Sequence, residues 1–509
     1  MKEKRTGKKD RKLLWGTIII SMILSLMVFY VLYNANNKYM TREEKAIHGI
    51  LYADGSYDSL PVYYLSREWE YYPDVLLTPG DDLEKYYFRY LSIGEYGGME
   101  LDDRNGNPYG SGTYRLRIML PSEEHTYGLY LPEIFSAYNL YVDGKLIEQV
   151  GNPDPDHYEE RIQHRMFTFK GHTSVEIMIA VTDKDSASPG IQYVPAFGNP
   201  LKVNTVRGIP IFLNSSVFTL VLLVLIFSVW AFFRTRSRAN ALFAGVCVCV
   251  LGYTCYPLLH TYLALRVQPW FSLEMLFYYL TFPAMLLLEH EITGRKYKWV
   301  WWLVGFTAAA GIGATVAGIF AGGMETAALS YGVSAVTEVL KWFTAICLVV
   351  IAFFYTEGTR GLPLLAGTVL YASSLAADRI WPLYDPIIGG WFPEWGGTIL
   401  AGVFGVILWR ELTDGYRMRL IYEEQSRQME LRLMMQKEHY EKLTGALEEA
   451  SRTRHDMRQY IRTASMLLEE EHYEQLREYF HQFAKESSEK MQAPMCYCNI
   501  MQASWKMQE

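Results

Sequence analysis

The sequence is poor in cysteine: its 509 residues include six, and none of them lies between residues 34 and 208. Four lie in apolar runs and two near the C-terminus: Cys247, Cys249, Cys255, Cys347, Cys496 and Cys498. A disulfide framework in residues 34–208 is therefore excluded, so this segment must be stabilised by a core of its own. No other ligand cluster accompanies Cys496 and Cys498, and we predict no metal site.

Proline and glycine are scarce toward the C-terminus. No proline lies between Glu411 and Pro494, and no glycine follows Gly445. Their absence favours long helices. It also excludes from these residues an ATP-binding domain with glycine-rich loops, because such loops need glycine to bring the backbone close to phosphate. We therefore predict no cofactor-binding residues in this chain.

The chain also lacks a strong excess of charge of either sign. Its formal net charge is −7, and no long basic stripe occurs outside the membrane flanks. Nucleic acid is therefore not an expected partner. Hydrophobic residues make up 50 % of the sequence and charged residues 20 %, which lies between soluble and membrane proteins, so individual segments decide the class.

The N-terminus combines a basic segment with a long apolar run. Residues 1–12 read MKEKRTGKKDRK, and residues 13–33 form a largely apolar run without a charged residue. A run of about 20 residues is long enough to cross a bilayer, and no small-residue cleavage site follows it. We predict an uncleaved transmembrane anchor, with the basic end in the cytoplasm and residues 34–208 outside the cell.

Residues 209–410 contain seven further apolar runs, at about 210–233, 240–260, 271–289, 298–320, 332–355, 361–380 and 392–409. Every second loop is basic and carries Arg234, Arg236, Arg238, Arg295, Lys296, Lys298 and Arg360, whereas the outward loops contribute Arg266 and Arg379. This bias follows the positive-inside rule. It predicts a multi-pass protein of the cell membrane with eight spans, of which seven form an all-α bundle, and with both termini in the cytoplasm.

Four ionisable residues fall within these predicted spans: Glu274, Glu338, Lys341 and Asp378. Each is predicted near the end of a span, where a long side chain can reach the interface. No series of carboxylates follows one span, so a proton-coupled transporter is disfavoured.

Residues 34–208 have the pattern of β-strands. Residues 113–120 and 174–181 alternate apolar and polar side chains, which is typical of half-buried strands. Residues 138–147 form two apolar arms around Asp143-Gly144, the signature of a tight hairpin. Short strands separated by turn clusters predict a β sandwich or jelly roll.

The segments REWEYYPDVLLTP, GSGTYRLRIMLP, AYNLYVDGKLIEQVG and PAFGNP resemble the extracellular jelly-roll module of bacterial seven-transmembrane receptors with diverse intracellular signalling modules. The resemblance implies a galactose-binding-type fold and an extracellular small-molecule or carbohydrate ligand. Aromatic residues here either stack on a sugar or fill the core, and we favour the core for most of Trp69, Tyr71, Tyr72, Tyr86 and Tyr87.

Residues 411–450 predict a coiled-coil linker. A mostly apolar seam recurs at spacings of three and four residues: Met429, Leu433, Gln436, Tyr440, Leu443, Leu447 and Ala450. It continues through Met457, Ile461, Ala464 and Leu468, and a turn at EEEHY precedes a second amphipathic stretch with Leu476, Phe480 and Phe483 on one face. Two such hairpins make a four-helix bundle, so residues 451–492 predict a homodimer through the cytoplasmic helices.

His455 lies beside this seam, on a side that solvent reaches, and Asp456 follows it. An exposed histidine on a helix is ordinarily polar surface, but an imidazole with one unprotonated nitrogen is also a nucleophile. The segment RHDMRQYIRTASMLLEEEHYEQLREYF resembles the dimeric phosphoacceptor hairpin of sensor histidine kinases with an Arg-His-Asp box. The resemblance implies that His455 is phosphorylated, that Asp456 is its acidic neighbour, and that a response regulator receives the phosphate. This family often has a polar His or Asn at the positions where this chain has Gln459 and Tyr460, so the sequence departs from the family pattern here.

Such kinases hold ATP and Mg²⁺ in a GHKL-type domain, and residues 493–509 look like the start of a linker to one. ATP and Mg²⁺ are therefore expected only for a full-length kinase or a partner kinase. We predict a membrane sensor histidine kinase of a two-component system; the alternative is a receptor or phosphotransfer subunit that a partner kinase phosphorylates.

Overall fold

The structure is a computed structural model that describes residues 2–53, 55–94, 110–121, 123–184, 190–263, 265–294, 297–320, 327–355 and 361–492. The chain divides into two compact units, Met1–Arg410 and Glu411–Glu509. Cys496, Cys498 and the predicted linker 493–509 lie outside the described residues, as do the basic loop residues Arg295, Lys296 and Arg360. Mixed helix and sheet in separate segments confirm the coarse expectation of a multidomain chain.

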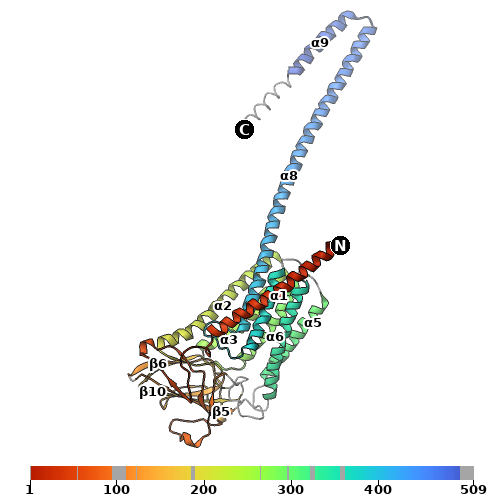
Figure 1. The fold of residues 1–509 in the computed structure, drawn as a ribbon. Helices are drawn as coiled ribbons and strands as arrows, with labels where there is room; N and C mark the ends of the chain where they lie inside the picture. Colours follow the sequence, from red (N-terminus) through yellow and green to blue (C-terminus); the bar gives the residue numbers. More distant parts are fainter. Residues whose placement is uncertain are drawn as a thin grey trace. The chain divides into compact units, whose positions relative to one another are not determined.

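The helices in chain order are α1 (Lys2–Ala35), α2 (Pro200–Thr235), α3 (Arg238–Tyr262), α4 (Trp270–Ile292), α5 (Lys298–Ile319), α6 (Ala327–Tyr355), α7 (Leu362–Ile380), α8 (Phe392–Glu469) and α9 (Tyr473–Gln492). The strands, all between α1 and α2, are β1 (Ile50–Tyr52), β2 (Tyr63–Tyr64), β3 (Trp69–Pro73), β4 (Arg89–Leu91), β5 (Gly110–Met119), β6 (His125–Leu131), β7 (Ala137–Val142), β8 (Lys145–Val150), β9 (Arg165–Gly171), β10 (Ser174–Asp183) and β11 (Ala196–Gly198). Figure 1 shows both sets.

The strands form two sheets, which we call the β domain (residues 50–198). One sheet has the order β4-β3-β5-β10-β7-β8 with β1 paired to β5, and the other has the order β2-β11-β6-β9. All pairs are antiparallel except β1 with β5. The predicted alternation is observed in β5, where Tyr114 and Leu116 are 0 % exposed. In β10 Met178 and Ala180 are buried as well as Ile177, so the second half of that strand is covered on both faces rather than half-buried. Both sheets contribute to one hydrophobic core.

The hairpin predicted at Asp143-Gly144 is present between β7 and β8. Asp143 has φ 47° and Gly144 has φ 75°, the positive values that a two-residue turn requires. Val142 pairs with Lys145 across the turn. The register places Leu140 and Val142 in the core, with 0 % and 3 % exposure.

Arg115, on β5, points away from the core and binds two carboxylates. Its Nη1 lies 2.8 Å from Glu70 Oε2 on β3, and its guanidinium also donates to Glu176 on β10. Burial lowers the pKa of Arg115, but the hydrogen bonds to Glu176 and Glu70 outweigh it and raise the pKa above the ordinary value. The three central strands are thus cross-linked on their outer face.

The five aromatic residues named above separate into two groups. Trp69, Tyr71 and Tyr72 are at most 2 % exposed, so the core assignment is confirmed for these three. Tyr86 and Tyr87 are 37 % and 70 % exposed. The exposed pair continues into Phe88 and Tyr90, whose rings meet edge to face at 5.6 Å.

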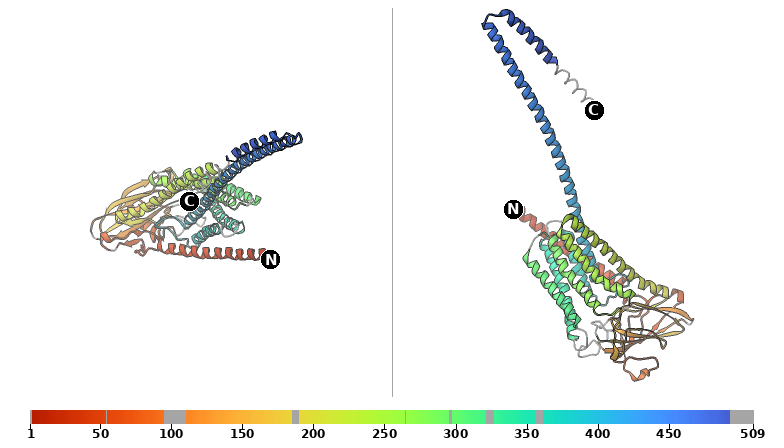
Figure 2. Two further views of the ribbon diagram at one scale, coloured as in Figure 1. Left: turned by 90° about the horizontal axis from the view of Figure 1, so that it is seen from above. Right: turned by 180° about the vertical axis from the view of Figure 1, so that it is seen from behind.

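Helices occupy all eight predicted spans, and seven described helices are long and apolar enough to cross a membrane. The eighth, α7, is not among the seven; it is only 19 residues long and carries Asp378 and Arg379 near its C-terminal end. Sequential helices from α2 to α7 pack side by side and α1 packs on α7 (Figures 1 and 2). The start of α8 contributes Leu400, Phe404 and Leu408 to the apolar core of these helices, and the predicted anchor, α1, packs on the predicted bundle rather than apart from it.

One predicted boundary is wrong. The β domain was expected to extend to residue 208, but α2 begins at Pro200. The Asn199 side chain accepts a hydrogen bond from the Leu201 amide at 3.0 Å, and proline is favourable in the first turn of a helix. Val203 is 0 % exposed and packs in the hydrophobic core of the β domain. The first turn of α2 therefore contributes to the β domain as well as to the helix bundle.

A second correction concerns the ionisable residues. Glu338 and Lys341 lie near the middle of α6, where they form an ion pair of 2.6 Å, rather than at its end. Pairing at i and i+3 allows two opposite charges to share one helix face. Glu274 lies close to the start of α4, as predicted, and is 8 % exposed.

Candidate functional site

His455 and Asp456 lie on α8, within the unit Glu411–Glu509. Their side chains are 79 % and 51 % exposed, and His455 Nδ1 lies 3.8 Å from Asp456 Oδ1. This distance is too long for a hydrogen bond, but the Nδ1 side of the ring faces the carboxylate. The predicted pair is therefore adjacent and solvent-accessible, and Nε2 lies on the side of the ring away from Asp456.

The helix that carries His455 is continuous because nothing in its sequence interrupts it. The single glycine close before the histidine is Gly445, and the backbone remains helical there. Ion pairs at i and i+4 support the exposed surface, with Lys442 Nζ 2.8 Å from Glu438 Oε1 and Arg419 Nε 2.9 Å from Glu423 Oε1. The coiled-coil linker and the first hairpin helix, whose seam is predicted to run without a break, are thus one helix.

The turn predicted at EEEHY ends α8. Glu471 takes the left-handed conformation with φ 56°, and the His472 amide donates to the Leu467 carbonyl at 3.1 Å. A left-handed residue with such a bond is a common helix C-cap. The chain reverses here and α9 begins at Tyr473, so the helix–turn–helix order is confirmed.

The contact between α8 and α9 differs in one residue from the predicted face. Tyr460 on α8 packs against Phe483 at 4.7 Å between ring centroids and against Tyr479 at 5.7 Å. Leu476, Tyr479 and Phe483 are half-buried, whereas Phe480 is 55 % exposed. Tyr479 therefore takes the place that we assigned to Phe480, because Tyr460 supplies an aromatic partner on that side.

The rest of the seam lies at the surface of the single chain. Its exposed members include Leu433 at 54 %, Tyr440 at 71 %, Leu447 at 67 %, Ile461 at 66 % and Leu468 at 56 %. A stripe of large apolar side chains at spacings of three and four is the surface that a second helix covers in a coiled coil. Sequence alone located this stripe.

Sequence analysis missed a junction between the C-terminal end of α1, the α7–α8 connection and the β domain. Lys38 Nζ lies 2.8 Å from Asp385 Oδ1, with 11 % and 6 % of these side chains exposed. Asp385 Oδ2 also accepts from the Val194 amide in the β domain at 3.0 Å. Asp385 precedes the start of α8, so one carboxylate connects three segments. No spacing signal could have found it, because the partners are distant in sequence.

Two asparagines complete this junction. Asn36 exchanges hydrogen bonds with the backbone of Ile388, at 2.7 Å and 2.8 Å. Asn37 donates to the Leu383 carbonyl at 2.9 Å and accepts from the Asp385 amide at 3.2 Å. The α7–α8 connection is thus held by side chains that mimic strand pairing.

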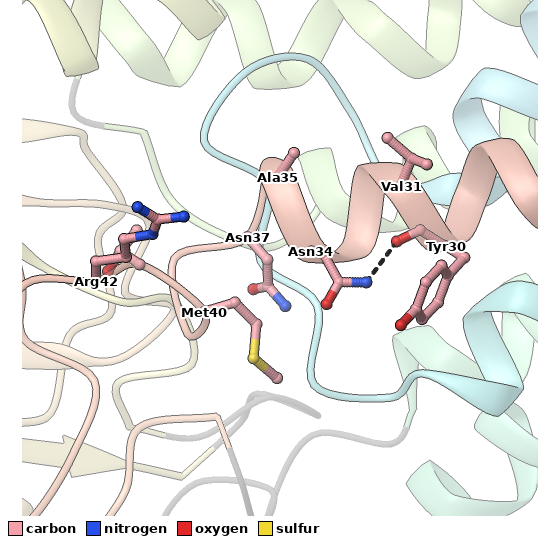
Figure 3. Close-up of a pocket in the computed structure, with 8 residues that line it drawn as sticks. Tyr30, Val31, Asn34, Ala35, Asn37, Met40 and Arg42 are labelled. Atoms are coloured by element: carbon pink, nitrogen blue, oxygen red, sulfur yellow. Dashed lines mark hydrogen bonds between the residues drawn. The ribbon is translucent and has the colours of Figure 1, made fainter.

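A pocket of about 480 Å³ opens beside this junction, lined by Tyr30, Val31, Asn34, Ala35, Asn37, Met40, Thr41 and Arg42. Figure 3 shows the Asn34 amide donating to the Tyr30 carbonyl, at 2.8 Å. Because Asn34 and Asn37 are engaged in internal hydrogen bonds, they offer a ligand little specific recognition. We therefore regard the pocket as part of the junction.

Comparisons with known proteins add little. No family model matches the chain, and no curated protein sequence matches it. Among solved structures, a GH2 β-galacturonidase from Eisenbergiella tayi bound to galacturonate is 12 % identical, covering 27 % of this chain and 24 % of its own, with a TM-score of 0.20. A β-glucuronidase from Faecalibacterium prausnitzii is 10 % identical over 27 % of this chain and 32 % of its own, also with a TM-score of 0.20.

A β-glucuronidase from Ruminococcus gnavus is similarly distant. It is 10 % identical, the match covers 27 % of this chain and 28 % of the enzyme, and the TM-score is 0.20. The chain thus spans between about a quarter and a third of the length of these enzymes. TM-scores this low carry no argument about fold or function. The sequence, the fold and the geometry of the sites have to support any functional conclusion.

Proposed function

We propose that this chain is a membrane sensor histidine kinase of a two-component system, or the sensing part of one, and that it carries phosphate on His455. The observation that supports this most is the exposed His455-Asp456 pair on a helical hairpin with an exposed apolar seam. A phosphoacceptor must be reached first by an ATP-holding domain and then by a response regulator. Exposure of 79 % leaves the His455 ring open to both.

The chemistry assigns different tasks to the two ring nitrogens. Asp456 lies on the Nδ1 side of the ring, and we assign to the reactive form of His455 the tautomer that carries its proton on Nδ1. Nε2 is then unprotonated and attacks the γ-phosphorus of ATP. A P–N bond forms, the bond from phosphorus to the β–γ bridging oxygen breaks, and ADP leaves. The positive charge on the phosphorylated ring is balanced by Asp456 or removed by loss of the Nδ1 proton.

ATP and Mg²⁺ would be bound by a GHKL-type domain. That domain belongs either to a longer form of this polypeptide or to a separate kinase, in which case this chain is a receptor or phosphotransfer subunit. The two versions share the phosphoacceptor and differ in the source of the ATP-binding domain. In both, the phosphate passes from His455 to an aspartate of a response regulator.

The seam supports a homodimer through the cytoplasmic helices. Leu447 and Ile461 are 67 % and 66 % exposed in the single chain, and two copies would bury them against each other. A dimer of α8–α9 hairpins is a four-helix bundle with a His455 on each of its two first helices.

We assign the β domain as an extracellular jelly-roll sensor for a small-molecule or carbohydrate ligand, with both chain termini in the cytoplasm. Tyr87 and its aromatic neighbours Tyr86, Phe88 and Tyr90 offer exposed ring faces on which a sugar stacks. Asp385 offers the route for the signal, because it contacts both the β domain and the segment that leads into α8. A displacement of the domain would shift the start of the helix that carries His455.

The test is phosphate labelling in membranes from cells that make the chain. Wild-type membranes incubated with γ-labelled ATP should acquire a phosphate on the chain that is labile to acid and stable to base. His455→Gln should remove that label, and His439→Gln, another exposed histidine of α8, should keep it. A label that persists in His455→Gln, or wild type that stays unlabelled both alone and with candidate kinases added, would overturn the proposal.

A further inference from the structure

Three side chains from separate segments meet where the β domain contacts α3. Glu133 lies in the loop after β6, His164 lies just before β9, and His260 lies near the C-terminal end of α3. His164 Nε2 is 3.0 Å from Glu133 Oε1, and His260 Nε2 is 3.6 Å from the same oxygen. All three ligand atoms lie within 4.8 Å of one another.

We propose that Glu133, His164 and His260 bind a zinc ion, or a divalent ion of similar ligand preference, that fastens the β domain to α3. Imidazole nitrogen and carboxylate oxygen are zinc ligands, and two histidines with one glutamate, leaving the fourth position to water, are a ligand set found in catalytic zinc sites. Two ligand atoms on a tetrahedral zinc, each about 2.0–2.1 Å from the metal, lie about 3.3 Å apart. The separations of 3.0 Å and 3.6 Å bracket that value.

The surroundings of His164 favour its binding of a metal through Nε2. Its Nδ1 lies 2.9 Å from the hydroxyl oxygen of Tyr130 on β6. When Nδ1–H donates to that oxygen, Nε2 is left unprotonated and directed at the site. Such a hydrogen bond from the second ring nitrogen is the usual support of a metal-binding histidine.

His260 provides an independent indication. It is 1 % exposed, its Nδ1 is buried and has no hydrogen-bond partner among the described residues, and its Nε2 is too far from Glu133 for a hydrogen bond. A buried polar ring without adequate partners is costly. Its ring stacks on His164 with 5.3 Å between centroids, which brings the two Nε2 atoms to the same side. A metal bound by Nε2 would supply the missing interaction.

The position of the site suggests its role. Around it the β domain and the α3–α4 connection already touch: Ile162 pairs with Leu265 as an isolated bridge, and Ile162, Tyr256 and Val267 form a small core. The Gln268 amide donates to Glu160 at 3.0 Å. A metal held by two residues of the β domain and one of α3 would make this contact rigid.

Zinc binding to the full-length chain in detergent tests the proposal. After chelation and gel filtration, wild type should bind one zinc per chain at about 1 µM free zinc. His164→Gln and His260→Gln should each lose that zinc, and Tyr130→Phe should weaken it by roughly ten- to a hundredfold. His157→Gln, a histidine that is 78 % exposed and outside the cluster, is the matched control and should bind normally.

Two further measurements keep the test decisive if a variant folds poorly. The double variant Cys496→Ser/Cys498→Ser should retain the zinc, and cobalt bound to wild type should lack a thiolate charge-transfer band. Zinc should also raise the Tm of wild type and not that of His260→Gln, since a ligand stabilises the state that binds it. Wild type that binds no zinc under these conditions, or zinc that is lost with the two cysteines, would overturn the site. The labelling of His455 is independent of either result.

Discussion

The β domain and the cytoplasmic helices bury their apolar residues in opposite ways. In the β domain Trp69, Tyr114 and Ile179 are 0 % exposed, so one copy completes its own core. In α8 Leu447 and Ile461 are 67 % and 66 % exposed, so no described part of the chain covers these seam residues. The first region needs no second copy to fold, whereas the second is complete only with a partner surface, and we propose that a second copy supplies it.

The largest effect is expected from Trp69→Ala. Trp69 is 0 % exposed and its indole N–H donates to the Leu65 carbonyl at 2.8 Å. Removing a large buried aromatic side chain costs about 3–5 kcal/mol. Urea unfolding followed by tyrosine and tryptophan fluorescence should show the β domain destabilised, and cross-linking of the cytoplasmic helices should be unchanged. Loss of both together would contradict the independence of the two regions.

A smaller effect is expected from Leu447→Asp or Ile461→Asp. A charge in the seam opposes its burial against a second helix, so the dimer dissociation constant should rise by roughly tenfold or more, which is about 1.4 kcal/mol per tenfold. Analytical ultracentrifugation in detergent measures it. Arg452→Asp, also on the exposed surface of α8, is the control. If the seam variants dimerise like wild type, the interface lies elsewhere.

Within the hairpin we expect a modest effect from Tyr460→Ala. The variant loses the ring contacts to Phe483 and Tyr479, at 4.7 Å and 5.7 Å. Aromatic pairs contribute about 0.5–1.5 kcal/mol beyond the area they bury. Tyr440→Ala, 71 % exposed in the seam, should leave the α8–α9 contact intact. Hydrogen exchange of α9 distinguishes the two, and equal protection in both variants would argue against the observed packing.

The smallest expected effect is on the pH dependence of folding stability. Burial lowers the pKa of Lys45 from 10.5 to about 8. Between those values the unfolded chain binds more protons than the folded chain, so this group makes stability rise with pH across the window from 8 to 10.5. Lys45→Met should flatten the slope of Tm against pH in that window. A slope equal to that of wild type would exclude Lys45 as its source.

Local patterns predicted much of this architecture. The Asp143-Gly144 hairpin follows from turn chemistry, and the single helix through His455 follows from the lack of proline between Glu411 and Pro494 and of glycine after Gly445. The start of α2 at Pro200 was missed because its first turns pack on the β core, which periodicity along one segment does not reveal. Tyr479 in place of Phe480 was missed because the choice depends on Tyr460 across the hairpin.

The residues that join distant segments were beyond sequence analysis altogether. Asp385 contacts Lys38 and Val194, and Glu133 meets His164 and His260, yet none of these pairs has a diagnostic spacing. Metal and ion-pair contacts assembled by tertiary folding carry no short motif. His455 was found because its neighbours in the chain, rather than in space, carry the resemblance.

The most direct test of the central claim is to locate the phosphate. The chain should be isolated from its own cells or labelled membranes at neutral to basic pH, digested, and sequenced by mass spectrometry under conditions that preserve phosphohistidine. We predict phosphate on the peptide that contains His455, and its disappearance when a cognate response regulator is added. Phosphate on another residue, or a His455 peptide that stays unmodified in actively signalling cells, would contradict the proposed function.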